Sequence, residues 1–545
     1  MVAKIKAIKS YIASAPQDEN TAQLLAYIAD IEKDIKGKKY GLVFEEHREA
    51  IDEILEQNTP VLTEEKDLFI DNGGQMNFLI EGDNLAALQL LEKTHKGKID
   101  LIYIDPPYNT GSKDFVYDDA FVDDNDGYKH SKWISFIEKK LIIAHKLLGS
   151  DGFIMISIND IELYNLKLLC DQIFGENNFL ANMIWQSTPG SNTGLDIKTV
   201  TEYVLCYAKN KVTCATSSKP VNDKGKYNLE DEYVSERGKY ILNKLDRRMT
   251  GQHYSDALNY QIEMPDGTFL YPGNNVEKPQ NWNWRWSKTK VEWGKENGYI
   301  IFKKSKEGWA VYFKQYYLVD NNGLRINRSL PYQNLIKDLD GANSARGTQE
   351  VMGIFQSKAF DYPKPLNLIK YLLDIHKNKS LTILDFFAGS GTTGHAVMAL
   401  NAEDGGTRKF ILCTNNENNI CRDVTYERIK RVIERDQYEA SLKYYKVDYV
   451  PISDKMYYEY ADELLKHIRE LVELENGINF NGNAEIAIIL KEQELDEFAD
   501  KLPSECHAIY LGHDVLPNKE QETLFKEHGI AVHIIPDYYY RELEG

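Results

Sequence analysis

Short apolar runs alternate with longer stretches of mixed polarity along much of the chain. Five such runs, each five to seven residues long, lie at 99–103, 152–158, 203–207, 381–385 and 409–413. Runs of this length that are rich in Ile, Leu, Val and Phe predict buried strands. Helix-compatible sequence, such as 395–400, follows some of them. Strands that alternate with helices are typical of domains with a parallel sheet, so the pattern predicts an α/β fold.

The pattern changes at both ends of the chain and in its middle. Near the start, apolar residues fall close to helical spacing at Leu24, Leu25, Ile28, Ile31 and Ile35, which predicts a helical region. Turn-forming Gly, Asn, Asp and Pro interrupt the strand-helix rhythm in 211–357. Three short apolar runs after residue 480 predict a small C-terminal α/β domain, whose expected role is dimerisation or partner docking. The predicted segments are 1–70, 71–210, 211–357, 358–445 and 446–545.

The first chemical motif is Asp105-Pro106-Pro107-Tyr108, directly after the strand at 99–103. Ligands of open α/β sheets bind at the carboxyl ends of strands. The two prolines fix the backbone and remove two N–H donors, which leaves carbonyl oxygens beside a carboxylate and an aromatic ring. Such acceptors and a stacking ring suit a planar exocyclic amine. The alternative is a plain strand-to-turn connection in which Asp105 caps a nearby group.

The second motif is a glycine loop, in which Gly389, Gly391 and Gly394 have G-x-G-x-x-G spacing between a strand and a helix. Such glycines let the backbone approach a ligand at a helix N-terminus. The loop alone would also fit a dinucleotide, whereas a phosphate-binding P-loop requires Lys and Ser or Thr where the chain has His395 and Ala396.

Two acidic residues decide between the ligands of this loop. Asp385, at the end of the strand before the loop, would repel a pyrophosphate but suits the ammonium of S-adenosylmethionine. Glu417 follows the next strand, at a position suited to binding ribose hydroxyls. The alternative for Glu417 is a solvated acid in a loop.

The order of the two motifs resembles that of β-class adenine-N6 DNA methyltransferases, a circular permutation of the commoner order. Residues 77–83 look like the third strand of that family, and 360–365 resemble its short motif before the glycine loop. The resemblance implies a circularly permuted, Rossmann-like methyltransferase domain that uses S-adenosylmethionine, with a target-recognition domain inserted at 211–357. It implies catalytic roles for Asp105, Pro106, Pro107 and Tyr108. It implies cofactor contacts by Asp83, Lys364, Pro365, Asp385, Phe386, Phe387, Gly389, Ser390, Gly391, Thr392 and Glu417.

Within that family, the string at 105–111 and the Asp-Phe-Val-Tyr-Asp-Asp at 114–119 are similar to the modification (Mod) subunit of Type III restriction-modification systems. This resemblance implies double-stranded DNA as substrate, a homodimer, and a separate helicase-nuclease restriction subunit, since no Gly-Lys precedes Ser or Thr here. Four alternatives stay open: a solitary or Type II-like adenine methyltransferase, a cytosine-N4 methyltransferase, an NAD-dependent oxidoreductase, and a non-catalytic DNA-binding subunit. The N4 enzymes more often carry Ser at the position of Asp105.

Charge is unevenly distributed for a chain that binds DNA. The whole chain carries −19, yet residues 280–306 hold seven Lys or Arg against two Glu, a local balance of +5. Because phosphate contacts supply most non-specific affinity for DNA, this window is the expected contact surface. It also holds four of the seven tryptophans, in part as a Trp-Asn-Trp-Arg-Trp strand, and at least two of them are expected in a core. The DNA-contact candidates are Arg247, Arg248, Arg285, Lys288, Lys303 and Lys304.

Several chemistries are disfavoured by residues that the sequence lacks. Its six cysteines form no C-x-x-C pair, so neither a zinc site nor a disulfide framework is expected, and no metal is expected. No cysteine follows a proline, as it would in cytosine-C5 methyltransferases. There is no signal-like start and no apolar run of about 18 residues, which predicts a cytoplasmic protein without a membrane partner.

Overall fold

The computed structural model describes residues 42–111, 126–189, 197–220, 224–249, 251–306, 308–337, 339, 341–452, 463–512 and 514–535, the strand backbone at 116–117 and 120–121, and a few single positions before residue 42. The chain divides into two compact units, which are Met1–Thr216 with Gln333–Gly545, and Ser217–Tyr332. The larger unit contains both chemical motifs. It therefore determines the geometry of the candidate site.

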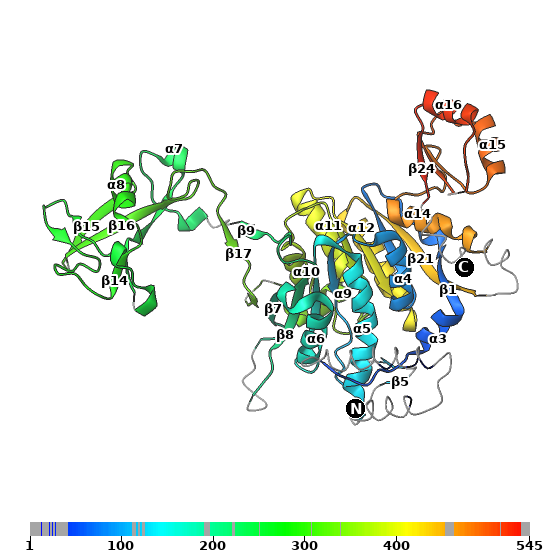
Figure 1. Cartoon of the computed structure of the whole chain (residues 1–545), viewed down its shortest axis with the longest axis horizontal. Coiled ribbons are helices and arrows are strands. Elements are labelled where there is room, and N and C mark those ends of the chain that lie inside the picture. The colour runs from blue at the N-terminus through cyan, green and yellow to red at the C-terminus, as the bar shows by residue number, and fades with distance from the viewer. Residues whose placement is uncertain are drawn as a thin grey trace. The chain divides into compact units, whose positions relative to one another are not determined.

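A ten-stranded sheet forms the centre of the larger unit (Figure 1). Its strand order is β1 (Asn58–Glu64), β21 (Ala440–Pro451), β2 (Gln75–Glu81), β20 (Lys409–Thr414), β19 (Thr382–Asp385), β3 (Ile99–Ile104), β6 (Leu148–Ile158), β8 (Thr201–Ala208), β7 (Phe179–Gln186) and β18 (Leu335–Ile336). The strands from β21 to β6 are mutually parallel, whereas β8 runs antiparallel to β6. All five apolar runs are strands of this sheet, which confirms the predicted α/β fold.

The sheet joins parts of the chain that are far apart in sequence. Strand β3 pairs with β19 in the registers Leu101–Ile383 and Ile102–Leu384, and β2 pairs with β20 and β21. Strands that follow residue 380 thus lie between strands that precede residue 210. The two chemical motifs end neighbouring strands for this reason.

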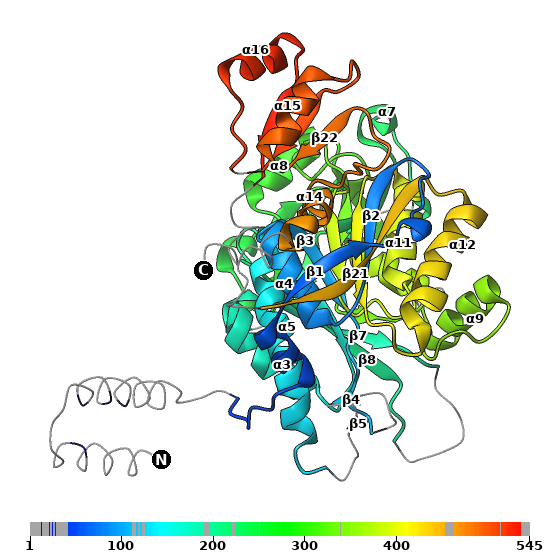
Figure 2. The same cartoon turned by 90° about the vertical axis from the view of Figure 1, so that its right-hand side faces the viewer.

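Helices cover both faces of the sheet (Figure 2). One layer contains α4 (Asn84–His95), α5 (Lys129–Leu147), α6 (Leu163–Cys170) and α14 (Ile468–Asn476); the other contains α9 (Ser344–Phe355), α10 (Leu366–Leu373), α11 (Thr392–Asp404) and α12 (Glu427–Asp436). Helix α5 buries Trp133, Ile137, Leu141 and Ala144. These positions recur every three or four residues, so one apolar stripe faces the sheet.

The sequence pattern predicts a helical region over 1–70, but the described part of this region contains a strand as well as a helix. A short helix, α3 (Ala50–Gln57), is followed by β1, which pairs antiparallel with β21 at the sheet edge. Val61 and Leu62 of β1 are buried, and Pro60 is tolerated because an edge strand can lack one donor. This short run with a proline gives a weak strand signal. The helical pattern at 24–35 and the string at 114–119 lie largely outside the described residues.

The smaller unit is built on a three-stranded antiparallel sheet of β10 (Tyr240–Lys244), β16 (Gly308–Tyr316) and β15 (Ile300–Ser305). Its other elements are β9 (Ser218–Pro220), α7 (Val234–Arg237), β11 (Asp246–Arg248), β12 (Ile262–Glu263), β13 (Phe269–Leu270), β14 (Trp282–Trp284), α8 (Lys288–Glu296) and β17 (Ser329–Pro331). Trp284 and Trp286 are buried in its core, which confirms the expectation for two tryptophans. The predicted Trp strand ends at Trp284, and Trp293 lies on α8. Strand β18 and α9 belong to the larger unit, so this compact unit is narrower than 211–357.

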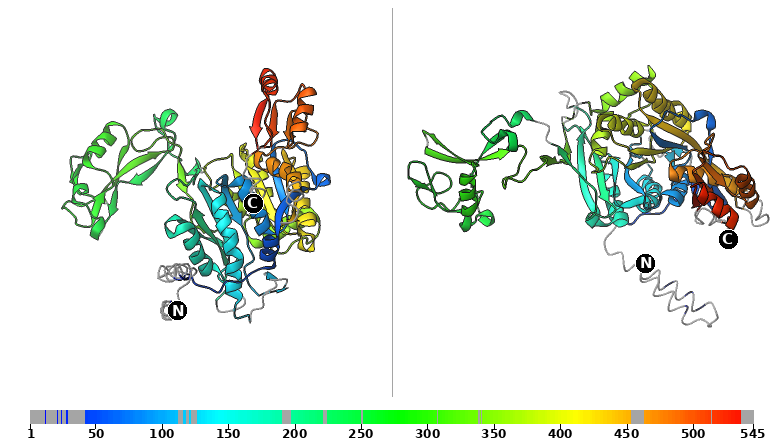
Figure 3. Two further views of the ribbon diagram at one scale, coloured as in Figure 1. Left: turned by 45° about the vertical axis from the view of Figure 1, so that its right-hand side comes forward. Right: turned by 90° about the horizontal axis from the view of Figure 1, so that it is seen from above.

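The C-terminal apolar runs form a parallel sheet of β22 (Ile486–Ile489), β23 (Ala508–Leu511) and β24 (Ala531–Ile534). Helices α15 (Glu492–Asp500) and α16 (Lys519–Glu527) lie with these strands in one cluster, orange to red in Figure 3. A separate small core includes Ile509, Leu511 and Phe525. Two further short strands, β4 (Val116–Tyr117) and β5 (Ala120–Phe121), pair antiparallel with each other. Across the part of the chain that the structure describes, no helix has the length and apolar character needed to cross a bilayer.

Candidate active site

Acidic residues stand at the carboxyl ends of neighbouring parallel strands. Asp105 directly follows β3, and Asp385 is the last residue of the adjacent strand β19. Glu81 ends β2, which lies beyond β20 in the same sheet. Ligands of open α/β sheets bind at this edge, so the fold gathers two predicted carboxylates, Asp105 and Asp385, where a ligand is expected, together with Glu81, which the sequence did not predict.

The Asp-Pro-Pro-Tyr loop is held by hydrogen bonds to residues from other elements. The Tyr108 hydroxyl lies 2.9 Å from Asp105 Oδ1 and 3.1 Å from Glu202 Oε2. Trp133 Nε1 on α5 donates to the Pro107 carbonyl over 2.7 Å. The next residue, Asn109, is buried with φ of 59°, and its amide donates to buried Glu162 over 2.6 Å. The loop is therefore anchored to α5, to the N-cap of α6 and to β8.

The side chain of Lys364 lies at the Asp-Pro-Pro-Tyr loop and not at the glycine loop. The family resemblance implies a cofactor contact for this residue. Its ammonium is 3.0 Å from Asp105 Oδ1 and 3.4 Å from Glu202 Oε2, and it lies 4.8 Å from the centre of the Tyr108 ring. Burial lowers the pKa of Lys364, but the two carboxylates outweigh burial and raise it above its usual range. Only its backbone reaches the other loop, since its carbonyl accepts a hydrogen bond from the Thr392 hydroxyl over 3.2 Å. Its predicted cofactor contact stays a prediction.

The glycine loop needs its glycines for two different reasons. Gly389 and Gly391 have φ of 49° and 76°, in the left-handed region that favours glycine. A Cβ at Gly389 would lie 3.2 Å from the Phe360 ring, so this backbone is already in close contact. A Cβ at Gly394 would lie 2.7 Å from Ile429 on α12. The first two glycines therefore shape the turn, and the third permits helix packing.

Buried Arg428 organises the hydroxyl groups of this loop. Its guanidinium donates to Thr392 Oγ1 over 2.7 Å and to Ser390 Oγ over 3.0 Å. Both hydroxyl side chains are buried, and Thr425 donates to the Gly389 carbonyl over 2.6 Å. Burial lowers the pKa of Arg428 to about 10. Since Ser390 and Thr392 face this arginine, any cofactor contact by them would come from their backbone.

Asp385 is enclosed by its own loop. Its carboxyl accepts hydrogen bonds from the Phe387 N–H over 3.0 Å and from the Thr393 hydroxyl over 2.5 Å. Burial is the main cause of a pKa raised to about 7; these hydrogen bonds lower it, and the charge of Asp105 raises it. A carboxyl that titrates near neutrality can respond to a nearby cation.

A cavity of about 470 Å³ lies at this edge of the sheet. Its lining includes six predicted site residues, which are Asp83, Asp105, Pro107, Phe387, Gly389 and Glu417. This volume lies in the range typical of small-molecule sites. The carboxylates and the close glycine backbone fit a cationic ligand with ribose hydroxyls. S-adenosylmethionine has this chemistry.

The other predicted cofactor residues lie around this cavity in different ways. Asp83 caps α4, since one carboxylate oxygen accepts from the N–H groups of Leu85 and Ala86. Phe386 is fully buried in the hydrophobic core, and Pro365 is the N-cap of α10. Glu417 is exposed at the end of the turn after β20. The structure thus brings some of these side chains to one cavity and turns Phe386 away from it.

The cavity also has lining residues that the sequence did not indicate. Glu49, at the N-cap of α3, lies 3.5 Å from the ammonium of Lys140 on α5. Phe136 and Tyr449 complete this side, and Lys140 lies 3.7 Å from the centre of the Phe136 ring. None of these residues belongs to a recognisable motif; a basic residue on the buried face of α5 is the only signal that could have drawn attention.

The predicted DNA-contact residues all lie in the smaller unit. Arg247 and Arg248 are on β11, and Lys303 and Lys304 are on β15. Arg285 and Lys288 lie between β14 and the start of α8, and both are exposed. Lys304 is already paired with Asp266 over 3.0 Å. The predicted positive surface is therefore partly neutralised within the unit.

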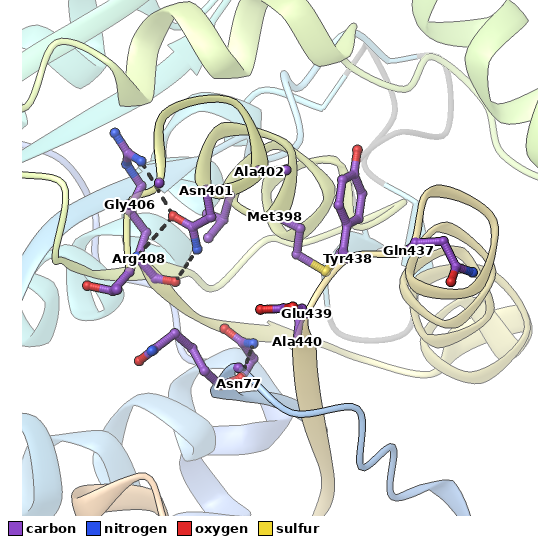
Figure 4. Close-up of a pocket in the computed structure, with 15 residues that line it drawn as sticks. Asn77, Met398, Asn401, Ala402, Gly406, Arg408, Gln437, Tyr438, Glu439 and Ala440 are labelled. Atoms are coloured by element: carbon purple, nitrogen blue, oxygen red, sulfur yellow. Dashed lines mark hydrogen bonds between the residues drawn. The ribbon is translucent and has the colours of Figure 1, made fainter.

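A second cavity, of about 430 Å³, lies at the opposite ends of the strands (Figure 4). Its walls come from the starts of β2 and β21 and from the segment between α11 and β20. Asn401 bonds to the backbone of Arg408 there in both directions, over 2.8 and 3.0 Å. It contains no predicted site residue. In the described ranges no three His, Cys, Asp or Glu residues are grouped so that they could hold a metal ion.

Comparison with known proteins places this geometry in a family. The chain is 33% identical to the Type III restriction-modification enzyme StyLTI Mod subunit of Salmonella typhimurium, over 68% of this chain and 57% of that protein. It is 36% identical to the Type II methyltransferase M.KpnI of Klebsiella pneumoniae, over 62% and 79%, and 31% identical to the EcoPI Mod subunit of Escherichia phage P1, over 64% and 58%. The chain thus spans less than two thirds of either Mod subunit. Residues 99–427, which include both motifs, match the family described as DNA methylase, N6_N4_Mtase. The chain belongs to this DNA methylase family.

Proposed function

We propose that the protein transfers a methyl group from S-adenosylmethionine to the N6 amine of adenine in double-stranded DNA. The observation that carries this proposal is the shared cavity, in which Asp105 of the Asp-Pro-Pro-Tyr loop and Gly389 of the glycine loop lie together with Glu417. Membership of the DNA methylase family supports the same reaction.

The cofactor-binding residues are proposed from the same cavity. Glu417 would accept hydrogen bonds from the ribose hydroxyls, and Asp83 would lie near the adenine of the cofactor. The backbone around Gly389 and Gly391 would approach the methionine part, beside Asp385. When bound, S-adenosylmethionine supplies a methyl group on a positively charged sulfur.

The target amine would be oriented by the catalytic loop. An exocyclic amine is a poor nucleophile because its lone pair is conjugated with the ring. Asp105 and the Pro106 carbonyl would accept hydrogen bonds from the two N–H groups of this amine. These contacts favour a pyramidal nitrogen whose lone pair points at the methyl group. The Asp105 contact strengthens as positive charge develops on nitrogen, so it stabilises the transition state more than the ground state. The Tyr108 ring would stack on the base, which offsets part of the cost of extruding it from the helix.

The atoms of the reaction balance without a covalent enzyme intermediate. The methyl–sulfur bond breaks, a nitrogen–carbon bond forms, and S-adenosylhomocysteine leaves as a neutral thioether. The methylated nitrogen then loses one proton, which passes to Asp105 or to solvent. These reaction steps need no nucleophilic side chain of the protein.

At the level of the system, we propose a Type III modification subunit with DNA as substrate. Two Mod subunits among the relatives support this assignment. The catalytic domain would be a circular permutation formed by 71–210 and 358–445, with 211–357 as the target-recognition domain, and the assembly would be a homodimer that joins a separate restriction subunit. The similarity to M.KpnI favours a Type II-like enzyme as the second candidate.

The test is a methylation assay with unmethylated genomic DNA and the tritiated cofactor, followed by identification of the modified base. We expect N6-methyladenine in one sequence context, and Asp105→Ala should lower the rate by at least about a hundredfold. Cofactor affinity should change little in that variant. Asp500→Ala, at the exposed end of α15, is the matched control and should keep full activity. N4-methylcytosine as the product would refute the adenine assignment.

A further inference from the structure

We propose that Glu202 is a positioning residue for methyl transfer. It holds the Tyr108 hydroxyl and balances the charge of Lys364, so that Asp105 presents its negative charge to the target amine. This inference rests on the proposed function and adds a residue that no sequence motif contains.

The topology of the sheet brings Glu202 to the site. Strand β8 runs antiparallel to β6, with Tyr203 opposite Ile158, the last residue of β6. The start of β8 therefore lies at the edge where the parallel strands end, beside the loop that follows β3. Glu202 itself pairs with Trp185 of β7. Glu202 is far from Asp105 in sequence, but it lies at the start of an antiparallel strand, where the parallel strands end, and so it reaches Asp105.

Four side chains form a closed ring of contacts. Tyr108 Oη and Lys364 Nζ both contact the same oxygen of Asp105, over 2.9 and 3.0 Å. The same two atoms contact one oxygen of Glu202, over 3.1 and 3.4 Å. A hydroxyl and an ammonium thus bridge two carboxylates. The side chain of Lys364 is only 11% exposed, and those of Asp105 and Glu202 are 25% and 22% exposed, so water screens these charges only in part.

The charges of this ring sum to one negative charge. Lys364 alone would cancel the charge of Asp105, because the two groups are in contact. Glu202 supplies the second negative charge, which leaves one for the substrate. Since positive charge develops on the target nitrogen during the reaction, a neutral ring would stabilise the transition state less than a negative one.

The ring also fixes the aromatic surface. A hydroxyl that is shared by two carboxylates has little freedom to rotate away, so the Tyr108 ring keeps one plane. Lys364 lies over that ring at 4.8 Å and limits it from one side. A stacking base would thus meet a prearranged surface.

Other ionisable groups face the ring and enter its titration. Asp385, on β19, and Tyr103, on β3, interact electrostatically with Asp105. Burial first, and then Asp105 and Glu202, raise the pKa of Tyr108 well above its usual range, so this hydroxyl stays protonated and donates. The charge of the ring can therefore change through its two carboxylates and Lys364.

The experiment compares Glu202→Gln, Lys364→Met and the double variant in methyl transfer to unmethylated genomic DNA, with kcat measured across pH. In Glu202→Gln the charge of Lys364 cancels that of Asp105 and the ring becomes neutral, so we expect kcat to fall about tenfold to a hundredfold and the acid limb of the profile to move to lower pH. Lys364→Met leaves two carboxylates facing each other, so its acid limb should move to higher pH. The double variant restores the net charge and should recover at least about fivefold of the kcat lost in Glu202→Gln.

The control is an ion pair away from the site, Lys370 with Glu403, removed by Lys370→Met and Glu403→Gln. These changes should leave kcat and both limbs unchanged. Calorimetric affinity for S-adenosylmethionine should stay within about threefold in Glu202→Gln.

The outcomes separate two failures. If the wild-type chain methylates DNA but Glu202→Gln keeps its rate, or the double variant is slower than Glu202→Gln, the positioning role is wrong and the proposed function stands. If the wild-type chain transfers no methyl group to DNA, the proposed function is wrong, and the role of Glu202 with it.

Discussion

Cofactor affinity should depend on pH through Asp385. Its carboxyl is buried with a pKa raised from 3.8 to about 7, mainly by burial. If the ammonium of S-adenosylmethionine binds beside it, the carboxyl must ionise on binding, because a cation favours the charged form. The free protein would then release a proton whenever it binds the cofactor below about pH 7.

The magnitude follows from this pKa. A carboxyl that is about 90% protonated at pH 6 and about 10% protonated at pH 8 makes apparent affinity about tenfold weaker at the lower pH. The same rise in pKa corresponds to about 4 kcal/mol. The same raised pKa affects folding. The contribution of Asp385 to the stability of the folded protein is complete below about pH 4 and is lost as pH rises through about 7.

The assay is titration calorimetry with S-adenosylmethionine at about pH 6, 7 and 8, values above the isoelectric point of about 5.2, in two buffers with different ionisation enthalpies. We expect release of about 0.9 proton at the lowest pH and about 0.1 at the highest. Asp385→Asn should remove this dependence. The control is Asp100→Asn, because Asp100 also has a pKa raised by burial but lies at the other end of β3.

Wild-type affinity that is the same at all three pH values, with no proton release, would refute the reasoning. Asp385 would then serve only to hold the glycine loop through Phe387 and Thr393.

Three further predictions concern single residues. Gly391→Val should weaken cofactor affinity at least about tenfold, since a Cβ there meets Thr425 at 3.3 Å and φ is 76°; calorimetry tests this, and Gly405→Ala, with no neighbour within 4 Å, should not change affinity. Tyr362→Gly should raise stability by up to about 1 kcal/mol in thermal unfolding, because this 88% exposed residue has φ of 53°, whereas Tyr362→Ala should bring no gain. Lys303→Ala should lower the salt slope of DNA affinity by about one without changing base preference, and Lys304→Ala should do less because of its pairing with Asp266; equal slopes in fluorescence anisotropy would show that β15 does not contact phosphate.

Local motifs were the features that sequence predicted best. Asp105 directly follows one strongly apolar strand and Asp385 is the last residue of another, and a strand's carboxyl end is a ligand-binding edge in any open α/β sheet. The glycine loop was predictable because its turn depends on backbone angles that few other residues adopt, as φ at Gly389 and Gly391 shows. The first strand, β1, was missed because its run is short and contains Pro60.

Side-chain direction was decided only by the tertiary structure. Lys364 lies within the short motif at 360–365, yet its ammonium turns to Asp105, because two carboxylates offer more favourable charge there than the glycine loop does. Phe386 and Phe387 are adjacent, but the first packs in the core and the second lines the cavity. Both residues lie in the turn after β19, and which of the two side chains points inward depends on the packed layers.

The sequence by itself determined which chemical groups stand in the two loops: a carboxylate, a proline carbonyl and an aromatic ring in one loop, and a glycine turn in another. Only the fold decided which distant residues complete the site. Glu202 and Glu49 reach it because β8 runs antiparallel to β6 and because the segment before α3 borders the cavity beside α5. Such contacts join residues far apart in the chain, and no local pattern of polarity encodes them, because they depend on how strands pair rather than on the residues next to them.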